Sequence, residues 1–518
     1  MKNPFFYFGL IAILLCTAGC DTQKNSAAKK TNERPNIIFI FSDDHTNNAI
    51  GAYGSRLAKT PHIDRIAAEG AIFHNFFVTN SICGPSRASL LTGKYSHVNG
   101  FLDNQDNKFD INQFVFSRLL SQSGYQTAWI GKWHLGTLPG DTFDYWNILP
   151  GQGFYFNPNF INPNNDTVRF EGYVTDVITQ LSTDWLDTRD KDKPFFLVMG
   201  EKATHREWLP DIQDLGAYDD VEFPLPETFY DDYTSRIAAG HQDMSISETM
   251  RLGIDLKIDV DYDKAWAYRR LNTAQKAAYK AYYQDKISKE FHEKKLTGRA
   301  LVEWKFQRYM RDYLATANSL DRNIGKLLDY LEANGLAENT IVVYGSDQGF
   351  YLGEHGWFDK RFIYEESLRT PFVIRYPKVI KPGTAIYQSL LNIDWAPTLL
   401  EIVGIKPPDE IQGESFLPIL HDNKIAGRDA VYYHYYEYPE PHRVIPHFGL
   451  RTDRYKLVRF YGEQNFWELY DLQQDPNELN NIYDKADNKG IVADLKKKLN
   501  QLIASYEDTG AVAVLAKE

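Results

Sequence analysis

Cysteine is scarce in this chain of 518 residues and occurs only at Cys16, Cys20 and Cys83. The first two lie in the N-terminal segment, so the rest of the chain holds one thiol and cannot form an internal disulfide. The fold must therefore rest on its apolar core, and a hydrophobic content of 43% in a chain of this length is enough to build one. We expect one large domain with a smaller one.

A surplus of positive charge is also missing. The chain has 57 Lys and Arg residues against 69 Asp and Glu residues, which gives a net charge of −12. Because nucleic-acid binders are usually basic, no nucleic-acid partner is expected. A chain of this charge that takes an anionic substrate must concentrate its cationic side chains, or a metal ion, in one place.

Long apolar runs are absent apart from one at the N-terminus, from Phe5 to Leu15, which is too short to span a bilayer comfortably. Thr17-Ala18-Gly19-Cys20 follows it and resembles the lipobox of bacterial lipoproteins. The resemblance implies a signal peptide over residues 1–19, lipidation of Cys20 and a polar tether over residues 20–33. We therefore expect an exported protein that is lipid-anchored in the bacterial envelope, in the periplasm or at the outer-membrane surface. An ordinary signal peptide that is cleaved elsewhere is the alternative.

Continuous apolar runs predict strands that are buried on both faces, and such runs are typical of a parallel sheet. They alternate with helical patterns, so we expect a mainly parallel sheet sandwiched by helices over residues 34–425. The predicted strands cover residues 37–41, 71–78, 126–130, 194–200, 340–344 and 372–377, and the predicted helices cover residues 61–70, 112–124 and 303–334.

The remainder of the chain has a different character. Residues 215–305 carry no strand signal and are expected to form a helical or irregular insertion on the surface. From residue 426 to residue 518, short alternating segments separated by turns predict an antiparallel sheet, which a helix near residues 490–505 closes. This part is the predicted smaller C-terminal domain.

Polar side chains follow several of the predicted strands, and the carboxyl ends of parallel strands meet at one edge of a sheet. Asp43 and Asp44 would repel each other there unless a cation neutralises them, and their oxygens suit calcium or magnesium; a helix N-cap pair is the alternative. In extended chain Lys132 and His134 point to the same side; a solvated lysine and a core histidine are the alternative. The other polar residues near strand ends are His205, Asp347, Gln348 and Lys360.

The stretch around Cys83 organises this set. Gly84-Pro85-Ser86-Arg87 follows the cysteine, and a helix-like run ends at Gly93. A thiol beside a guanidinium and at a helix N-terminus should have a lowered pKa, and the same position suits an anion. Cys83 is therefore interpreted as a reactive group that faces a negatively charged substrate; a small buried cysteine is the alternative.

Cys83-Gly84-Pro85-Ser86-Arg87, followed by Ala-Ser-Leu-Leu-Thr-Gly, resembles the signature of the type I sulfatases, and the resemblance covers the chain from Arg34 onward. It implies an alkaline-phosphatase-like fold. It also implies that a formylglycine-generating enzyme or an anaerobic sulfatase-maturing enzyme oxidises Cys83 to formylglycine, whose hydrate attacks the sulfur of a sulfate ester.

The same resemblance implies roles for the residues around Cys83. His205 follows Thr204 where the family commonly has proline, and Gln348 stands where many members have asparagine. The implied calcium ligands are Asp43, Asp44, modified Cys83, Asp347 and Gln348; Arg87 stabilises the formylglycine, Lys132 and Lys360 bind sulfate, His134 helps release it, and His205 is the acid for the leaving group.

The substrate is less closely defined. Residues 149–158 resemble a segment of bacterial polysaccharide sulfatases, including some that cut 6-sulfated N-acetylglucosamine. His442 and His447, in a Pro-rich turn, are expected to contact an acidic sugar, with turn residues of no function as the alternative. We expect hydrolysis of sulfate esters on a sulfated polysaccharide or oligosaccharide, of the N-acetylglucosamine type or from algae, with release of inorganic sulfate. The alternatives are a formylglycine-dependent phosphonate or phosphodiester hydrolase and a non-catalytic lipoprotein that binds sulfated glycans.

Overall fold

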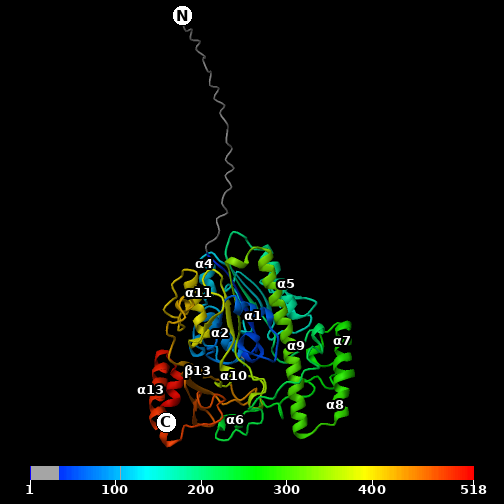
Figure 1. Cartoon of the computed structure of the whole chain (residues 1–518), viewed down its shortest axis with the longest axis vertical. Helices are drawn as coiled ribbons and strands as arrows, with labels where there is room; N and C mark the ends of the chain where they lie inside the picture. The colour runs from blue at the N-terminus through cyan, green and yellow to red at the C-terminus, as the bar shows by residue number, and fades with distance from the viewer. Residues whose placement is uncertain (2–33, 106, 518) are drawn as a thin grey trace. The chain divides into compact units, whose positions relative to one another are not determined.

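The computed structural model describes residues 34–105 and 107–517, together with Met1 (Figure 1). The predicted signal peptide, its tether and the Cys20 lipidation site therefore lie outside the described residues, apart from Met1. Within the described residues, no helix is both long enough and apolar enough to cross a membrane.

Strand β1 (Asn36–Ser42) is buried along its whole length, and its side chains alternate between two apolar cores. Ile38 and Ile40 belong to one core, whereas Ile37 and Phe39 belong to the other. Because successive side chains of a strand point to opposite faces, a strand that is covered on both sides needs apolar residues at every position. This explains the continuous apolar run in the sequence.

Helices cover both faces of the sheet that β1 belongs to (Figure 1). The first core lies against α1 (Pro61–Ala68), α5 (Val174–Thr188) and α9 (Gly298–Ala333). The second core lies against α2 (Cys83–Thr92), α4 (Phe116–Gln122) and α11 (Trp395–Ile402). The expected sandwich of helices around a sheet is confirmed.

The large sheet has ten strands in the order β11-β2-β10-β9-β1-β8-β4-β5-β6-β7. Its central strands β9, β1, β8, β4 and β5 are parallel, with Ile37 opposite Ile341 on one side and Phe196 on the other. The remaining bounds are β2 (Ala71–Phe73), β4 (Gln126–Lys132), β5 (Tyr145–Leu149), β6 (Asn159–Ile161), β7 (Thr167–Arg169), β8 (Phe195–Gly200), β9 (Thr340–Ser346), β10 (Phe372–Arg375) and β11 (Thr384–Ile386). The strand predicted over residues 71–78 is divided between β2 and β3 (Phe76–Phe77), and β3 pairs with β12 (Leu390–Leu391) in a separate sheet.

Strand β10 departs from the parallel pattern, since it runs antiparallel to both β9 and β2. Parallel strands need a crossover that returns the chain to the opposite edge of the sheet. Residues 347–371 contain only a 3-10 helix over Glu354–Gly356 and the short helix α10 (Glu365–Leu368), and they connect β9 to β10 without such a crossover. Lys360, which lies within this connection, is therefore kept at the edge where β1 and β9 end.

Helix α9 is the long helix that the sequence predicted, but it begins at Gly298 rather than near residue 303. The predicted apolar stripe is buried, as Tyr313, Leu320 and Leu331 show. The helix ends before Gly335, whose φ of +65° is the left-handed conformation that glycine adopts readily.

Residues 215–305 contain no strand, as expected, and include α6 (Ile237–His241), α7 (Thr273–Tyr279), a π-helix over Lys280–Ser288 and α8 (Lys289–Lys294). The expectation that this segment is a surface insertion is wrong in part. Leu256, Tyr262 and Tyr283 are buried in the core that α9 covers. Aromatic residues, in which the sequence of the segment is rich, bury it in the core that α9 also covers.

The C-terminal part forms the predicted antiparallel sheet, in the order β13-β14-β15-β16, with α13 (Lys489–Ser505) and α14 (Thr509–Leu515) beside it. Its apolar residues share one cluster with residues of the large domain, for example Phe448 and Leu469 with Trp357 and Phe362. The described residues from Arg34 onward form one compact unit, so the domain boundary near residue 425 stays a prediction. The strand bounds are β13 (Val431–Tyr435), β14 (His447–Arg451), β15 (Tyr455–Phe460) and β16 (Phe466–Asp471).

Candidate active site

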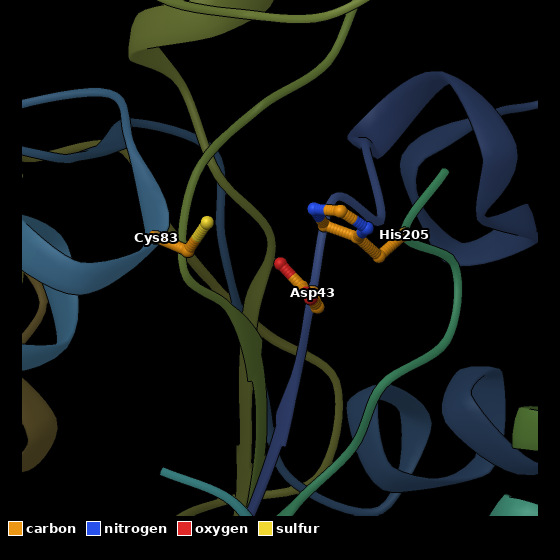
Figure 2. Close-up of side chains that lie close together, drawn as sticks. All are labelled: Asp43, Cys83 and His205. Carbon is orange, nitrogen blue, oxygen red and sulfur yellow. The ribbon is translucent and has the colours of Figure 1, made fainter. Parts of the chain in front are cut away.

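Polar residues from distant parts of the sequence meet where the parallel strands end. β1 leads to Asp43 and Asp44, β9 leads to Asp347 and Gln348, β4 ends at Lys132, His205 follows β8, and Cys83 begins α2. Figure 2 shows the Asp43 carboxylate and the His205 ring turned toward the Cys83 side chain. One ligand atom from each of these three residues lies within 4.8 Å of the others.

Three buried carboxylates lie at the centre of the site. One oxygen each from Asp43, Asp44 and Asp347 lies within 4.8 Å of the others. Each carboxylate has its own cation: Lys132 Nζ donates to Asp43, Lys360 Nζ donates to both oxygens of Asp44 at 2.7 and 2.8 Å, and Arg87 Nε donates to Asp347 at 3.0 Å. The six side chains therefore form three ion pairs that are shielded from water.

The pKa values show that the three cations do not fully compensate the negative charge of the three carboxylates. Burial raises the pKa of Asp347 to about 7, and the Asp43 charge adds to this effect. Burial likewise raises the pKa of Asp44 to about 6 against the opposing charge of Lys360. The pKa of Asp43 lies well below its usual value, because Lys132 and its other cationic neighbours outweigh the effect of burial. Two of the carboxylates are thus repelled by a third, and a bound cation would relieve this repulsion.

The donor set fits a divalent cation that prefers oxygen. Asp43 Oδ1 and Gln348 Oε1 are buried and accept no hydrogen bond from the residues that the structure describes. Gln348 Nε2 donates to Asp44 Oδ1 at 2.6 Å, which fixes the amide against the cluster. Carboxylate and amide oxygens are ligands of calcium and magnesium. Asp43, Asp44, Asp347 and Gln348 could therefore hold such an ion.

Cys83 lies at the start of α2 with 1% of its surface exposed. Asn104 Nδ2 donates to its Sγ at 3.6 Å. The expectation of a lowered pKa is wrong, because burial raises the pKa of this thiol. The Arg87 guanidinium, which was expected to lower it, instead bonds to Asp347. Unmodified Cys83 is therefore a neutral thiol, and the geometry does not support a thiolate nucleophile.

His205 lies on a loop that is hydrogen-bonded to the residue following β1. Thr204, where proline was the family expectation, donates its backbone N–H to the Asp43 carbonyl at 2.6 Å. His205 Nδ1–H donates to the Arg206 carbonyl at 2.6 Å. Burial, together with nearby lysine side chains, lowers the pKa of His205 well below its usual value, so its ring is neutral. A neutral ring becomes a proton donor only when an anion binds beside it and raises this pKa.

The predicted relation between Lys132 and His134 is wrong in its geometry. The backbone is not extended at His134, whose φ is +58°. The residue is half-buried, and its Nδ1 is buried and has no hydrogen-bond partner among the described residues. Burial and the Lys132 charge lower its pKa well below its usual value, while the Asp43 charge opposes this effect. Lys132 thus pairs with Asp43, and His134 lies close enough to both for their charges to act on its ring.

Left-handed backbone recurs around the site. The φ angle is +66° at Asp44, +80° at Asp359 and +98° at Arg361. Each such non-glycine conformation costs about 1–3 kcal/mol and persists where the surrounding contacts over-determine it. The Asp44 carbonyl accepts from the Tyr313 hydroxyl at 2.7 Å, and the Arg361 carbonyl accepts from the Tyr433 hydroxyl at 2.6 Å. Buried tyrosines therefore hold two of these positions, Asp44 and Arg361, in place.

A cavity of about 620 Å³ opens onto Cys83 and Lys360. Three of its residues form a charged group: Asp359 Oδ1 accepts from Arg361 Nε at 3.0 Å, and Asp359 Oδ2 lies 3.3 Å from His442 Nε2. His442 therefore lies in the wall of the cavity that contains Cys83, and its contact with a sugar stays a prediction. Gln152 belongs to the segment 149–158 that the sequence analysis singled out. Residues of this cavity that it did not single out include Asn104, Gln105, Arg206, Asp359, Arg361 and Glu437. Asp359 and Arg361 flank Lys360, and that charged tripeptide was the available signal.

His447 requires a correction. It is fully buried on β14 rather than in a turn, and both ring nitrogens are engaged. Its Nδ1–H donates to the Ile445 carbonyl at 2.8 Å, and its Nε2 accepts from the Ile363 backbone N–H at 3.1 Å. It has no free polar atom for a sugar. Its role is to join β14 to the loop that follows Lys360.

Comparison with known proteins gives a consistent result. The family model described as Sulfatase matches residues 35–405, and a model described as N-sulphoglucosamine sulphohydrolase, C-terminal, matches residues 353–505. An N-acetylglucosamine-6-O-sulfatase from Bacteroides thetaiotaomicron is 46% identical over 495 residues, which cover 93% of this chain and 88% of the relative. An ulvan-active sulfatase from Formosa agariphila is 27% identical, over 94% of this chain and 84% of the relative.

Among solved structures, a protein in complex with its substrate D-glucosamine-2-N,6-O-disulfate is 45% identical, with a TM-score of 0.89. The match covers 92% of this chain and 99% of that chain. The expected fold class is thereby confirmed: a mainly parallel, alkaline-phosphatase-like sheet sandwiched by helices, with a small antiparallel C-terminal sheet.

The structural role of His447 leads to a prediction about stability. Burial lowers the pKa of His447 to about 3, from an ordinary value near 6.5. Between these values the unfolded chain takes up a proton that the folded chain does not, so His447 lowers the free energy of unfolding by about 1.4 kcal/mol per pH unit as the pH falls below about 6.5. We expect His447→Gln to be less stable than the wild type at pH 7, but to lose stability less steeply from pH 6 to pH 4. Urea unfolding at stepped pH measures this slope.

The matched control is His421→Gln, at an exposed histidine, which should keep the wild-type slope. A His447→Gln protein with unchanged stability and a raised KM for a sulfated sugar would instead restore His447 as a substrate contact.

Proposed function

The chain belongs to the sulfatase family, and we propose that it hydrolyses the 6-O-sulfate ester of N-acetylated or N-sulfated glucosamine in sulfated glycans or their fragments. The reaction consumes one water and yields the sugar alcohol, inorganic sulfate and a proton. The convergence of three carboxylates, their three cations and His205 around Cys83 carries this proposal. The choice of sugar is supported by the relative of 46% identity, which is named for N-acetylglucosamine 6-O-sulfate.

We propose that Cys83 is oxidised to formylglycine and that Asp43, Asp44, Asp347 and Gln348 bind calcium. When present, these two groups supply a hydrated aldehyde as the nucleophile toward sulfur and a positive charge beside the sulfate oxygens. The cysteine lies in the cavity and next to the carboxylate cluster, which is where such a group is required. A neutral buried thiol suits a residue that is consumed by modification.

Lys132 and Lys360 stay in place before substrate arrives, because Asp43 and Asp44 hold their ammonium groups. Cationic donors that are already oriented in a dry site stabilise the charge that develops on the sulfuryl group. Arg87 acts one step further away, since it donates to Asp347 and, at 2.9 Å, to the Lys132 carbonyl. It positions the carboxylate and the lysine backbone together.

His205 is proposed to protonate the leaving oxygen of the sugar. Its ring is neutral in the free protein, and the negative charge of a bound sulfate ester would raise its pKa. The Arg206 carbonyl holds Nδ1–H and leaves Nε2 for the proton that is transferred.

The leaving-group sugar is proposed to lie against Asp359, Arg361 and His442. Asp359 and Arg361 are linked to each other, and Arg361 also donates to the Tyr435 hydroxyl at 3.2 Å and to Glu437. A fixed carboxylate beside a fixed guanidinium can accept from one hydroxyl group and donate to its neighbour. This arrangement supports recognition of two adjacent hydroxyl groups of one sugar ring.

An algal glycan is a less well supported substrate, since the ulvan-active relative is only 27% identical. A phosphonate or phosphodiester hydrolase would use the same kind of centre and is separated from a sulfatase by assay. A non-catalytic glycan-binding protein is disfavoured because Asp43, Cys83 and His205 meet at one point, and Lys360 lines the same cavity as Cys83.

We also propose that the chain is exported and lipid-anchored through Cys20. Support for this comes from the N-terminal sequence alone, in which an apolar run precedes Thr17-Ala18-Gly19-Cys20. A sulfated polysaccharide or its fragments would be met outside the cytoplasm, which agrees with export.

The activity is tested with purified protein that has been matured in a host with a formylglycine-generating enzyme. We expect release of sulfate from N-acetylglucosamine 6-sulfate and from glucosamine-2-N,6-O-disulfate, and loss of all turnover in Cys83→Ala. Ion chromatography of free sulfate measures both. Faster hydrolysis of an aryl phosphodiester than of any sulfate ester would support the phosphodiesterase instead, and turnover by Cys83→Ala would refute the nucleophile.

The metal site is tested by thermal unfolding after chelation. We expect added calcium to raise the melting temperature, since an ion at a hundredfold excess over its Kd adds about 2.7 kcal/mol to the free energy of unfolding. Asp347→Asn should lose this response, whereas Asp409→Asn, at a fully exposed carboxylate, should keep it. Absence of a calcium response in the wild type, together with no metal in the purified protein by atomic absorption, would remove the ion from the proposal.

Peptide mass analysis of the protein from its native host tests the two modifications. We expect the Cys83 peptide to carry an aldehyde that reacts with a hydrazide and resists alkylation by iodoacetamide. We expect the N-terminal peptide to begin at an acylated Cys20. A free thiol at Cys83 would favour the binding protein, and a start elsewhere would indicate an ordinary signal peptide.

A further inference from the structure

A second cavity of about 310 Å³ adjoins the one that contains Cys83. The two cavities share Gln152, His205 and Arg206 in their walls. His205 is the residue proposed to protonate the leaving oxygen, so the second cavity begins beside the scissile ester. Neither the carboxylate cluster nor the Asp359 group lines it.

Lys202 lines this second cavity and is 95% buried, with 5% of its surface exposed. Its ammonium lies 4.7 Å from the centroid of the Tyr155 ring. Among the described residues it makes no hydrogen bond and no ion pair, in contrast to Lys132 and Lys360, which each hold a carboxylate. A buried charge without a partner is costly, and burial lowers the pKa of Lys202 to about 8. An anion in the cavity would supply the missing partner.

An aromatic wall faces the cavity from residues 215–305. Trp266 is 58% exposed, unusually so for a tryptophan, and stacks on Phe154 with ring centroids 4.1 Å apart. Exposed aromatic rings that are held by a neighbouring ring are suited to contact with the apolar face of a sugar. Arg251, which is exposed, also lines the cavity, and Glu207 is the one carboxylate among its lining residues.

We propose that this second cavity is a subsite that binds a further oxyanion of the substrate glycan, a sulfate or a carboxylate, through Lys202, while Trp266 contacts the sugar ring that carries it. This inference rests on the proposed function, because it names a second charged group on the same substrate. The oxyanion can belong to the target sugar itself or to the adjoining sugar. Arg251 also lines the cavity and adds positive charge to it.

The subsite is tested by comparing Lys202→Met with the wild type on three substrates. These are N-acetylglucosamine 6-sulfate, which has no second anion; glucosamine-2-N,6-O-disulfate, which has one on the target sugar; and N-acetylglucosamine 6-sulfate joined to a uronic acid, which has one on the neighbour. Loss of a charged hydrogen bond should lower kcat/KM about tenfold for the substrate whose anion reaches Lys202, with little change for the first. Trp266→Ala should lower kcat/KM several-fold for the same substrate.

The control is Lys264→Ala, which removes the same charge from the loop that carries Trp266, at a side chain that is 87% exposed and outside the cavity. It should match the wild type on all three substrates. Equal losses by Lys202→Met on all three would show that Lys202 acts on the scissile sulfate and would overturn the subsite. No loss on any of them would overturn it as well.

A binding measurement tests the subsite independently of the proposed sulfatase activity. The acidic disaccharide without its 6-sulfate cannot be turned over, so calorimetry with Cys83→Ala protein reports on the subsite alone. We expect Lys202→Met in that background to weaken binding about tenfold. If the wild type has no sulfatase activity but Lys202→Met still weakens binding, only the proposed function is refuted. If the wild type is active but Lys202→Met weakens binding neither of this ligand nor of glucosamine 2-N-sulfate, only the subsite is refuted.

Discussion

The mutual repulsion of Asp43, Asp44 and Asp347 is the constraint on which the site depends. Three carboxylates buried within 4.8 Å of one another are tolerated because Lys132, Lys360 and Arg87 each neutralise one of them. Lys132 and Lys360 also lie close enough to Cys83 for their charges to act at that position. A single set of ion pairs therefore stabilises the folded edge of the sheet and prepares it for an anionic ester.

The C-terminal sheet supports one of the loops that form the site. Its apolar residues pack with Trp357 and Phe362, which flank Lys360 in the sequence, and His447 bonds to the Ile363 backbone. Through these contacts the small sheet fixes the loop that carries Asp359 and Arg361. The walls of the two cavities thus combine a rigid sheet edge, this supported loop and the aromatic segment that contains Trp266.

The strongest sequence signals were those that depend on near neighbours in the chain. The apolar run over residues 37–41 and the stripe of α9 predicted β1 and a core helix, because periodicity reports burial directly. The predictions for the pKa of Cys83 and for His447 were wrong for the opposite reason. The Arg87 side chain bonds to Asp347, 260 residues away, and His447 is buried by strands that its own neighbours in the sequence do not identify.

The sequence by itself determined the parallel sheet, the polar residues at its strand ends and, through the stretch around Cys83, the family. Only the tertiary structure decided which cation holds which carboxylate and that burial keeps the Cys83 thiol neutral. It also decided that, within the part of the chain that the structure describes, Lys202 makes no hydrogen bond or ion pair while Lys132 and Lys360 do. Strand and helix patterns are local and can be read along the chain, whereas charge pairing and desolvation depend on distances between segments that only the folded chain brings together.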